Sequence, residues 1–560
     1  MEPPARSGAE YFVEALEQYG VTRLFGNPGT TELPVVQSVG DSSIDYVLGL
    51  HEDIAVGMAS GYARTRRYHA HDDSDVTPLG VVNLHVAPGL AHGVGNVIGA
   101  SFAGSPLLVT AGNHSTDFQH EEPILGGELE PLVEQYTKWS AEVKDVRALP
   151  TMLRRAVRVA LTPPTGPVFL GLPLDVMLAE TDAEIERLGA IPNAGRGDPD
   201  AIEAAVELLV DAEEPVVVLG DEVARAGRSA VDAAVSLAEA TGARIHGEFI
   251  AAEVNCPTDH PQWAGRLPGT EAGLSAALDT DTIVHVGVST NTTSIRHEDA
   301  LVPADARTIH VGPDAWELGK NEPSDVAVIG DTGLVAAELR DGVADRISDS
   351  ERSDRLDRTA EAIDRLAAAP VAERPDDPRA SKDQLGEALA EAAGDAYFVT
   401  EAVTSNRSLH EHVPLKPGAT IANKSGGLGY GLPAAVGAAI AEREHDTPRD
   451  VVCLIGDGSY LYYPNTLYSA ARYDVDLTVV VSDNRNYRIL KNNTLRVLGG
   501  EEDDHEFVAM DFEPPVDIPK NAESHGADGR VVDDPDAIAS AIEAARAESG
   551  PTVLDVLVHD

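Results

Sequence analysis

The sequence predicts an α/β protein of three domains, each a mainly parallel sheet flanked by helices. The chain has 560 residues, and at about 100–200 residues per domain this length suggests three. Short apolar runs alternate with helical stretches in each third of the chain, as is typical of parallel sheets. We expect strands at Arg23–Phe25, Tyr46–Leu50, Val81–Leu84, Leu107–Thr110, Val168–Leu172, Val216–Leu219, Ile245–His246, Ile283–Val286, Thr308–Val311, Val326–Ile329, Tyr397–Thr400, Val451–Ile455, Thr478–Ser482 and Val553–Leu557.

Two stretches of distinct composition suggest the domain boundaries. Ile191–Pro199 is rich in Pro, Gly and Asn, and Ser348–Pro378 is dense in Asp, Glu and Arg. Helix formers run through Asp354–Ala369, so part of the second stretch is expected to form an exposed helix. These boundaries predict domains at 1–185, 195–345 and 379–560, with a linker at 346–378.

The chain is strongly acidic, with 42 Lys and Arg, 93 Asp and Glu and a formal net charge of -51. Such a surface repels nucleic acid phosphates and anionic membranes, so we expect neither as a partner. The acidic residues are spread along the whole chain. This favours a protein that works in concentrated salt, because salt screens the repulsion between like charges. We therefore expect a halophilic source, and an ordinary acidic enzyme is the alternative.

Cysteine usage and hydropathy indicate the compartment. Cys256 and Cys453 are the only cysteines and lie in different predicted domains, so they form neither a disulfide framework nor a zinc site. Met1–Glu10 lacks the apolar segment of a signal peptide, and no run of about 18 apolar residues occurs. We expect a cytoplasmic protein.

The clearest chemical signal follows two apolar strands of the last third. The strand ending at Ile455 runs into Gly456-Asp457-Gly458, where glycines allow close approach of a bulky anion and Asp457 offers an oxygen to a cation. The strand ending at Val481 leads to a loop with polar oxygens at Asn484 and Asn486. Neighbouring parallel strands end at one edge of a sheet, and Mg²⁺ prefers oxygen ligands shared with phosphate. The alternative is two unrelated turns.

This spacing resembles the thiamine diphosphate signature. Gly456-Asp457-Gly458 is followed, after 24 residues, by Asp483-Asn484, whereas the signature usually ends in Asn-Asn. The resemblance implies thiamine diphosphate and magnesium, the metal being bound by the side chains of Asp457 and Asn484 and by the backbone of Asn486. It also implies that the three domains are a pyrimidine-binding domain, a central Rossmann-like domain and a diphosphate-binding domain.

Two further loops match the family's cofactor-binding segments. Lys424–Pro433 resembles the segment that holds the pyrimidine ring; the carbonyl of Gly426 would accept from its amino group and Leu428 would hold the cofactor bent. Glu401–Asn406 resembles a loop that touches the diphosphate, with Thr404 as the contacting side chain. From the residues alone, each is only a loop that enters a helix.

Glu52 is the expected pyrimidine partner in the first third. Taken alone, it is an acid favoured at the start of a helix. The segment Glu52–Arg64 resembles the family's Glu helix with its Gly-Tyr-Ala triplet, in which this Glu shares a proton with the ring of a cofactor bound by a second subunit. The resemblance therefore implies at least a homodimer, and we expect a homotetramer. No motif singles out His51 or His92.

Within the family, the whole chain resembles benzoylformate decarboxylases and, more loosely, acetolactate synthases, and three stretches of the first domain carry the closer match. Phe25–Pro34 is similar to the loop whose hydroxyl residue contacts the substrate carboxylate, a position held here by Thr30. Asn83-Leu84-His85 is similar to the active-site histidine strand, and Leu107–Gly112 to the next strand. The resemblance implies that His85 relays a proton; the alternative is a histidine bonded only to backbone.

Three departures from that branch concern the substrate. Its second histidine would align with Ser294, and His297 three residues later is a possible replacement. The positions of its phenyl pocket correspond to Ala422, Ile489 and Asn493, and only 5% of all residues are aromatic. These features favour a smaller or more polar substrate than a phenyl keto acid.

The sequence thus predicts non-oxidative decarboxylation of a 2-keto acid to an aldehyde. The alternatives are acetolactate synthase-like carboligation of two 2-keto acids and a non-catalytic thiamine diphosphate-binding paralogue. No Gly-x-Gly-x-x-Gly follows a strand in the central third, so a bound flavin or nicotinamide is not expected.

Overall fold

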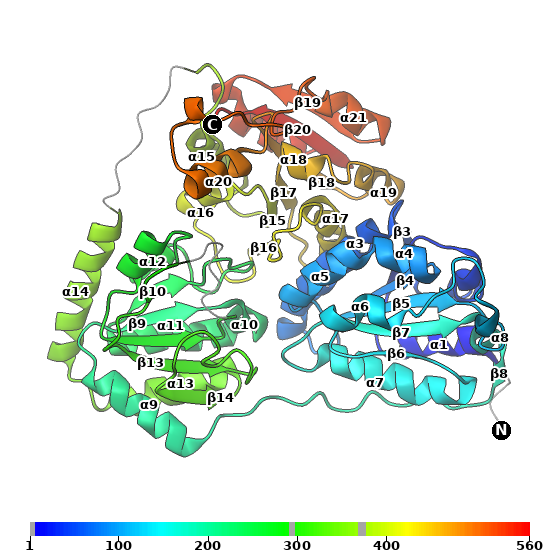
Figure 1. The fold of residues 1–560 in the computed structure, drawn as a ribbon, viewed down its shortest axis with the longest axis horizontal. Helices are drawn as coiled ribbons and strands as arrows, with labels where there is room; N and C mark the ends of the chain where they lie inside the picture. The colour runs from blue at the N-terminus through cyan, green and yellow to red at the C-terminus, as the bar shows by residue number, and fades with distance from the viewer. Residues whose placement is uncertain (1–5, 290–296, 368–376) are drawn as a thin grey trace. The chain divides into compact units, whose positions relative to one another are not determined.

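The computed structural model describes residues 6–289, 297–367 and 377–560 and contains three six-stranded sheets (Figure 1). The described residues form two compact units. One unit carries the N-terminal and C-terminal sheets, and the other carries the central sheet. The predicted α/β fold of three sheets flanked by helices is confirmed.

The N-terminal sheet has the strand order β3-β2-β4-β5-β7-β6 and is parallel throughout. All five predicted strands are present, and the structure adds the short edge strand β6. The strands are β2 Arg23–Gly26, β3 Asp45–Leu48, β4 Gly80–Leu84, β5 Leu107–Asn113, β6 Ser140–Glu142 and β7 Val168–Pro173, with a separate pair β1 Arg6–Ser7 and β8 Glu180–Thr181. The helices are α1 Gly8–Gln18, α2 Leu33–Gly40, α3 Glu52–Asp72, α4 Val86–His92, α5 Val94–Phe102, α6 Glu130–Val133, α7 Leu149–Leu161 and α8 Leu174–Leu178.

The C-terminal sheet has the order β16-β15-β17-β18-β20-β19 and contains all four predicted strands. Gly456 pairs with Ser482 across the parallel strands β17 and β18, so the two predicted motif loops do leave the same edge. The strands are β15 Tyr397–Glu401, β16 Thr420–Ala422, β17 Val451–Gly456, β18 Leu477–Asp483, β19 Asp528–Val532 and β20 Pro551–Leu557. The helices are α15 Lys382–Ala393, α16 Asn406–His412, α17 Gly431–Arg443, α18 Asp457–Tyr460, α19 Thr466–Arg472, α20 Arg488–Leu498, α21 Ile518–Ser524 and α22 Ile538–Arg546.

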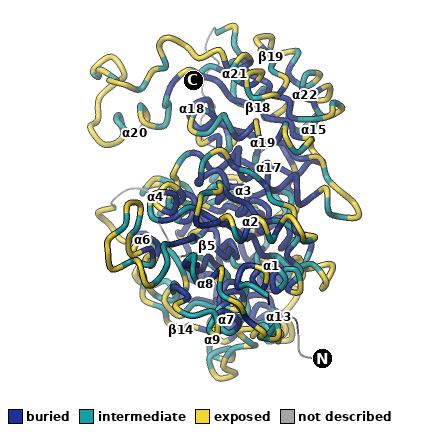
Figure 2. Tube along the Cα trace, turned by 90° about the vertical axis from the view of Figure 1, so that its right-hand side faces the viewer, coloured by how far each residue is buried: buried dark blue, intermediate teal, exposed yellow. Residues whose placement is uncertain are grey.

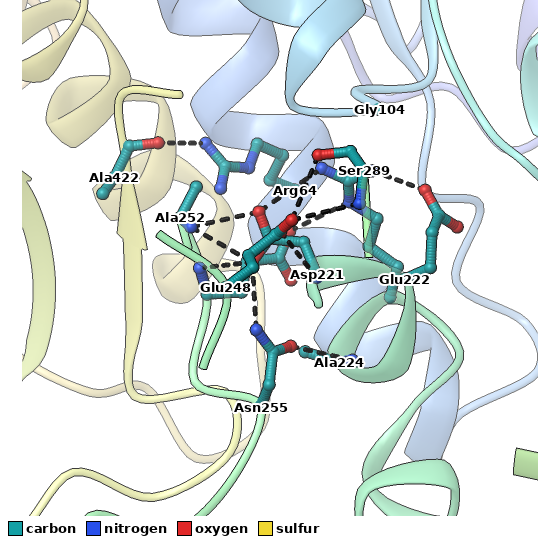
Figure 3. Close-up of polar contacts among 12 residues, drawn as sticks. Arg64, Gly104, Asp221, Glu222, Ala224, Glu248, Ala252, Asn255, Ser289 and Ala422 are labelled. Carbon is teal, nitrogen blue, oxygen red and sulfur yellow. Dashed lines mark hydrogen bonds and ion pairs between the residues drawn. The ribbon is translucent and has the colours of Figure 1, made fainter. Parts of the chain in front are cut away.

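The central sheet is parallel, with the order β11-β10-β9-β12-β13-β14. Its strands are β9 Val216–Leu219, β10 Arg244–Gly247, β11 Trp263–Arg266, β12 Thr282–Val286, β13 Arg307–Gly312 and β14 Val326–Ile329, and its helices are α9 Pro199–Asp211, α10 Asp221–Arg225, α11 Arg228–Thr241, α12 Glu271–Ala277 and α13 Thr332–Ala344. Buried carboxylates lie beyond β9 and β10 (Figure 3): Asp221 accepts from the amide of Ala252, and Glu248 accepts from Ser289. These acids anchor the loops at this edge.

A helix, α14 (Asp349–Ala367), occupies most of the stretch predicted as a linker. Its Arg355 guanidinium is buried and donates to the carbonyls of Leu209 and Val210 at the end of α9. Thr359 donates to the carbonyl of Gly242. The helix is therefore packed on the central domain along one face rather than exposed all round.

Helices α3 and α17 pack closely against each other at glycines, and this contact connects the two sheets of the larger unit. A Cβ added to Gly61 would lie 2.0 Å from the carbonyl oxygen of Ala434, and one added to Gly437 would lie 1.9 Å from that of Met58. Only glycine allows so close an approach of two backbones. Both helices are buried over most of their length (Figure 2), so they fix the segments that begin them, Glu52 in one and the loop before Gly431 in the other.

None of the helices in the described residues is both long enough and apolar enough to cross a bilayer.

The charge excess gives a stability prediction. A net charge of -51 opposes the compact state, and salt screens that repulsion over distances of about 10 Å at 0.1 M and about 3 Å at 1 M. We expect the melting temperature to rise by at least about 10 °C when KCl is raised from roughly 0.1 M to several molar. Calorimetry over a salt series measures this, with sucrose as an uncharged control. A melting temperature that does not change with salt contradicts adaptation to salt.

Candidate functional site

Glu52 lies at the first position of α3, where His51 caps the helix by accepting from the amide of Asp53 at 3.1 Å. Its side chain is largely buried, with a relative exposure of 8%. Asn27 Nδ2 donates to Glu52 Oε1 at 3.3 Å, and His92 Nδ1 lies 3.3 Å from Oε2. A mostly buried carboxylate with one amide donor and one imidazole is suited to exchange a proton. His92, which no motif singles out, is therefore part of this environment.

His85 forms a dyad with Glu32, which the sequence did not single out. His85 follows β4 and begins α4, and its Nδ1 lies 2.7 Å from Glu32 Oε2. Glu32 is 1% exposed and accepts from the Thr31 hydroxyl at 2.6 Å and from the amide of Gly29 at 3.1 Å. This contact argues against the alternative of a strand-end histidine bonded to backbone. A carboxylate on Nδ1 fixes the tautomer that leaves Nε2 free for proton transfer.

Close packing and backbone strain hold the His85 ring in place. A Cβ added to Gly29 would lie 2.1 Å from His85 Cγ, so only glycine lets the loop approach the ring. The next residue, Val86, has φ 40° and is 1% exposed. A β-branched residue at positive φ is rare and costs about 1–3 kcal/mol. Such strain persists only where the surrounding packing determines the conformation.

Thr30 begins a short 3-10 turn, Thr30–Glu32, and its side chain is exposed. Its neighbour Thr31 is buried, and the Thr31 hydroxyl lies 3.4 Å from His85 Nδ1. Thr30 is thus available to a substrate, while Thr31 belongs to the support of the dyad.

Replacement of Glu32 by glutamine should lower kcat by roughly 10–100-fold, because an amide cannot hold the imidazole tautomer as a carboxylate does. The pH profile of kcat/KM should change as well, because the imidazole has lost its carboxylate partner. The matched control is Glu142→Gln, which alters another buried glutamate of the N-terminal domain, at the end of β6, that accepts from Asn113. If kcat and its pH profile are the same in the wild type and Glu32→Gln, the dyad has no part in turnover.

Three buried carboxylates meet at the edge of the C-terminal sheet. Asp457 follows β17, Asp483 ends β18, and Asp555 lies in β20 beside Val481. Burial, and then the neighbouring Asp483, raises the pKa of Asp457 to about 8 and that of Asp555 to about 7. Asp457 Oδ2 and Asp555 Oδ1 have no hydrogen-bond partner among the described residues. Such a cluster is suited to a divalent cation, which supplies the missing positive charge.

The loop after β18 brings two amides to this cluster. Asn484 and Asn486 are both buried, and their Nδ2 atoms donate to the two carboxylate oxygens of Asp560 at 2.6 and 3.1 Å. Asn486 Oδ1 has no partner in the part of the chain that is described. Asp555 and Asp560 were not predicted. A signal for Asp555 was visible in the sequence, because it is an acid inside the apolar run of β20.

Glycine at 458 is required by the ring of Tyr487. A Cβ at Gly458 would lie 2.5 Å from Tyr487 Cε1. The Gly458 amide donates to Asp457 Oδ1 at 2.8 Å, which orients the carboxylate. The helix that begins in this motif, α18, is a single turn, so the close approach depends on the glycine itself.

Glu401 organises the loop that matches the pyrimidine-binding segment. This buried carboxylate accepts from the amides of Gly429 and Gly431 at 3.1 and 2.7 Å and from Asn423 Nδ2 at 2.7 Å. Burial raises its pKa to about 7. Within the loop, Gly426 is exposed with φ 75°, a left-handed conformation that favours glycine. Glu401 was predicted only as the start of a diphosphate loop, so its role in holding residues 423–431 is new.

The remaining predicted cofactor residues lie near this edge or on this loop. Leu428 is half-buried, and Gly456 ends β17. Thr404 is half-buried beside Ser405, whose hydroxyl lies 2.7 Å from that of Ser482 at the end of β18. The loop containing Thr404 is therefore adjacent to the strand end that carries the predicted metal ligands.

Asn96 joins the Glu52 segment to the Gly429 segment. Its Nδ2 donates to the carbonyl of Asp53 at 2.9 Å and to that of Gly429 at 3.4 Å. Its backbone amide donates to Asp53 Oδ1 at 2.6 Å. Burial raises the pKa of Asp53 to about 7. One side chain of α5 thus holds together two segments that are predicted to bind the cofactor.

The positions linked to substrate size lie in different environments. Ala422 is buried and its carbonyl accepts from Arg64 at 2.9 Å (Figure 3). Asn493 lies on α20, where its Oδ1 accepts from Arg496 at 2.8 Å and no described residue is buried. Ser294 lies outside the described residues. His297 is exposed and lines a pocket of the central domain.

Comparisons with known proteins agree with this architecture. Residues 6–137, 202–339 and 402–556 match, respectively, the N-terminal TPP binding domain, the central domain and the C-terminal TPP binding domain described for thiamine pyrophosphate enzymes. A benzoylformate decarboxylase of Pseudomonas aeruginosa is 33% identical over 85% of this chain and 86% of its own length. An acetolactate synthase of Bacillus subtilis is 25% identical over 98% of this chain and 93% of its own length. The solved structure of a Rhodococcus jostii thiamine diphosphate-dependent 4-hydroxybenzoylformate decarboxylase has a TM-score of 0.85 and 29% identity, covering 99% of both chains.

The fold and these matches define a three-domain enzyme that binds thiamine diphosphate, and the chain belongs to the thiamine pyrophosphate enzyme family. Within it, the chain belongs to the branch that contains benzoylformate decarboxylases and acetolactate synthases.

Proposed function

We propose that this enzyme catalyses the thiamine diphosphate- and magnesium-dependent, non-oxidative decarboxylation of a 2-keto acid to an aldehyde. The observation that carries the proposal is the His85–Glu32 dyad, at 2.7 Å, in the same domain as the mostly buried Glu52. A proton acceptor near the cofactor and a separate, oriented imidazole are the two groups such a reaction needs. The identity to the Pseudomonas aeruginosa benzoylformate decarboxylase supports the same reaction class.

The diphosphate-binding domain fits the cofactor and its metal. The buried, unpartnered Asp457 Oδ2 needs a cation, and Asn484 and Asn486 lie in the loop that follows β18, the strand paired with β17. We therefore assign the metal to Asp457, Asn484 and the backbone of Asn486. The diphosphate would contact Gly456, Gly458 and Thr404, and the pyrimidine would contact the Gly426 carbonyl and Leu428. When bound, the cofactor supplies an electron sink for the carbon–carbon bond that breaks.

The N-terminal domain supplies proton transfer. Glu52 Oε1 or Oε2 shares a proton with the pyrimidine ring, at a position that is largely buried. His85 Nε2 delivers a proton to the reacting carbon while Glu32 holds Nδ1. The exposed Thr30 hydroxyl contacts the substrate carboxylate. If Glu52 serves a cofactor bound by a second subunit, the functional unit is a homodimer or a homotetramer built from dimers.

Carboligation of two 2-keto acids is the second candidate. It is favoured by the acetolactate synthase of Bacillus subtilis, which aligns with 98% of this chain, more than the 85% that aligns with the benzoylformate decarboxylase. The two reactions share the same cofactor and the same decarboxylation step. They differ in what the reacting carbon then takes up, which is a proton in decarboxylation and a second 2-keto acid in carboligation.

A keto-acid panel separates the two reactions. Purified protein with thiamine diphosphate, magnesium and several molar KCl is supplied with one keto acid, and then with two. Aldehyde and carbon dioxide in equal amounts support decarboxylation, whereas a 2-hydroxy-keto product supports carboligation. Cofactor binding with neither product would support the non-catalytic paralogue.

Substrate size gives a further expectation. Benzoylformate should have a kcat/KM roughly 10–100-fold below that of a small aliphatic 2-keto acid, because burying a polar amide against a phenyl ring costs about 1–3 kcal/mol. The amide is that of Asn493, which already accepts from Arg496. Asn493→Phe should move the ratio of kcat/KM values toward benzoylformate. If the wild-type enzyme prefers benzoylformate by more than about tenfold, the substrate ring does not lie against Asn493.

We further propose that the enzyme is cytoplasmic and comes from a halophilic source. The formal net charge of -51, spread along the chain, supports adaptation to salt.

A further inference from the structure

Two histidines lie side by side inside the central sheet. His285 in β12 and His310 in β13 are paired in register on neighbouring parallel strands. Their rings are stacked, with centroids 4.6 Å apart and an interplanar angle of 8°. The side chains are 2% and 7% exposed. The alternate positions of both strands, such as Val284 and Ile309, are apolar core residues, so these are two polar groups in a buried layer.

The ring nitrogens of this pair are not satisfied. His285 Nε2 and His310 Nδ1 are buried and have no hydrogen-bond partner among the described residues. Buried polar atoms in proteins are nearly always hydrogen-bonded, and an exception indicates a missing water or ion. An uncharged imidazole that donates a lone pair is also the common protein ligand for transition metals.

A carboxylate completes the cluster. Glu322 Oε2 lies 3.7 Å from His285 Nε2, and one ligand atom from each of the three side chains lies within 4.8 Å of the others. The loop is held over β13 by Thr308, whose hydroxyl donates to the carbonyl of Pro323. Thr308 and His310 share one face of β13, so this bond keeps Glu322 beside the imidazoles.

A route to solvent exists at Glu322. It lines a pocket of about 1170 Å³ that is also lined by two further acids, Asp305 and Asp325. The two imidazoles come from rigid strands, and only side-chain rotation is needed to aim both nitrogens at one point. Two imidazoles, one carboxylate and a side open to water are the ligand set of zinc sites with three protein ligands.

We propose that His285, His310 and Glu322 form a binding site for a divalent transition-metal ion of the zinc class. The site lies in the central domain and is separate from the oxygen-rich magnesium site proposed at Asp457. Imidazole ligands select against Mg²⁺, so the two ions are distinguished by ligand chemistry. The bound ion would tie the loop that carries Glu322 to β12 and β13.

Zinc binding to the full-length protein, loaded with thiamine diphosphate and excess Mg²⁺, tests the proposal without measuring turnover. We expect one equivalent of Zn²⁺ per chain after dialysis, and visible absorption of tetrahedral type when Co²⁺ replaces it. Loss of an outer-shell partner costs roughly 10–100-fold in metal affinity, so loss of a ligand in His310→Gln should cost at least about 100-fold. Glu322→Gln, at a partly exposed position, tests the site with less risk to folding.

The matched control is a second stacked pair, His69 and His445, whose ring centroids are 4.2 Å apart. There Glu442 Oε1 lies 3.1 Å from His69 Nε2, so that pair is already satisfied. His445→Gln should therefore leave the stoichiometry and the Co²⁺ spectrum unchanged. A folded wild type that retains no Zn²⁺, or equal affinity in the wild type and Glu322→Gln, would overturn the proposal and would indicate a bound water instead.

Discussion

The Glu52→Gln enzyme should bind thiamine diphosphate normally and turn over roughly 10²–10⁴-fold more slowly, the usual contribution of a positioned acid–base group. The amide keeps the size of the side chain and can still accept from Asn27, so the loop and α3 are preserved. It cannot share a proton with a ring nitrogen. Exchange of the thiazolium ring proton, followed by NMR in the cofactor-loaded enzyme, should slow by a similar factor.

Two controls make this result specific to Glu52. Asp72→Asn makes the same change of charge at the other end of α3 and should alter neither rate. Glu32→Gln should lower turnover but leave thiazolium exchange fast, because its partner His85 acts on the substrate. If exchange in Glu52→Gln is as fast as in the wild type, Glu52 does not activate the cofactor.

Asp457→Asn should lower magnesium-dependent affinity for thiamine diphosphate by at least about 100-fold, since losing even an outer-shell partner costs roughly 10–100-fold. The same change should raise the melting temperature of the cofactor-free protein. Without a cation, burial and the neighbouring Asp483 disfavour the charged form of Asp457, so above the ordinary pKa of an aspartate folding costs free energy, and an amide removes that cost. Titration calorimetry with magnesium present and thermal melts without cofactor measure the two effects.

The two expected effects, a lower affinity for the cofactor and a higher melting temperature, distinguish a metal site from a structural role. A carboxylate needed only for folding would lower the melting temperature when it is replaced. Asp446→Asn, on an exposed loop, is the matched control and should change neither quantity. Wild-type affinity for the cofactor in Asp457→Asn would remove Asp457 from the magnesium site.

The sequence predicted the buried strands well because a strand covered on both faces is a continuous apolar run. β17 and β18 are such runs, and their adjacency followed from the rule that parallel strand ends share an edge. In the six-stranded sheets β6, β11, β16 and β19 were missed; all four lie at sheet edges and are short or polar.

The supporting residues of the site could not be predicted in the same way. Glu32 reaches His85 across 53 positions of sequence, and Asp560 reaches Asn484 across 76, so no local pattern records either contact. Glu52 could be proposed as a site residue from the sequence because it belongs to a continuous helical motif. Glu401 was noticed for its place after a strand, but its bonds to Gly429 and Gly431 depend on how the loop folds back over it.

The positive φ of Val86 has a consequence for the redesign of this protein. A procedure that chooses each residue by its backbone preference would place glycine or asparagine there, since valine is among the poorest choices for φ 40°. That choice would remove the buried isopropyl group that holds the chain next to His85. A redesigned sequence whose residues match their backbone conformations better would then orient the His85 imidazole less well. Position 86 should therefore be held fixed in any library aimed at greater thermal tolerance.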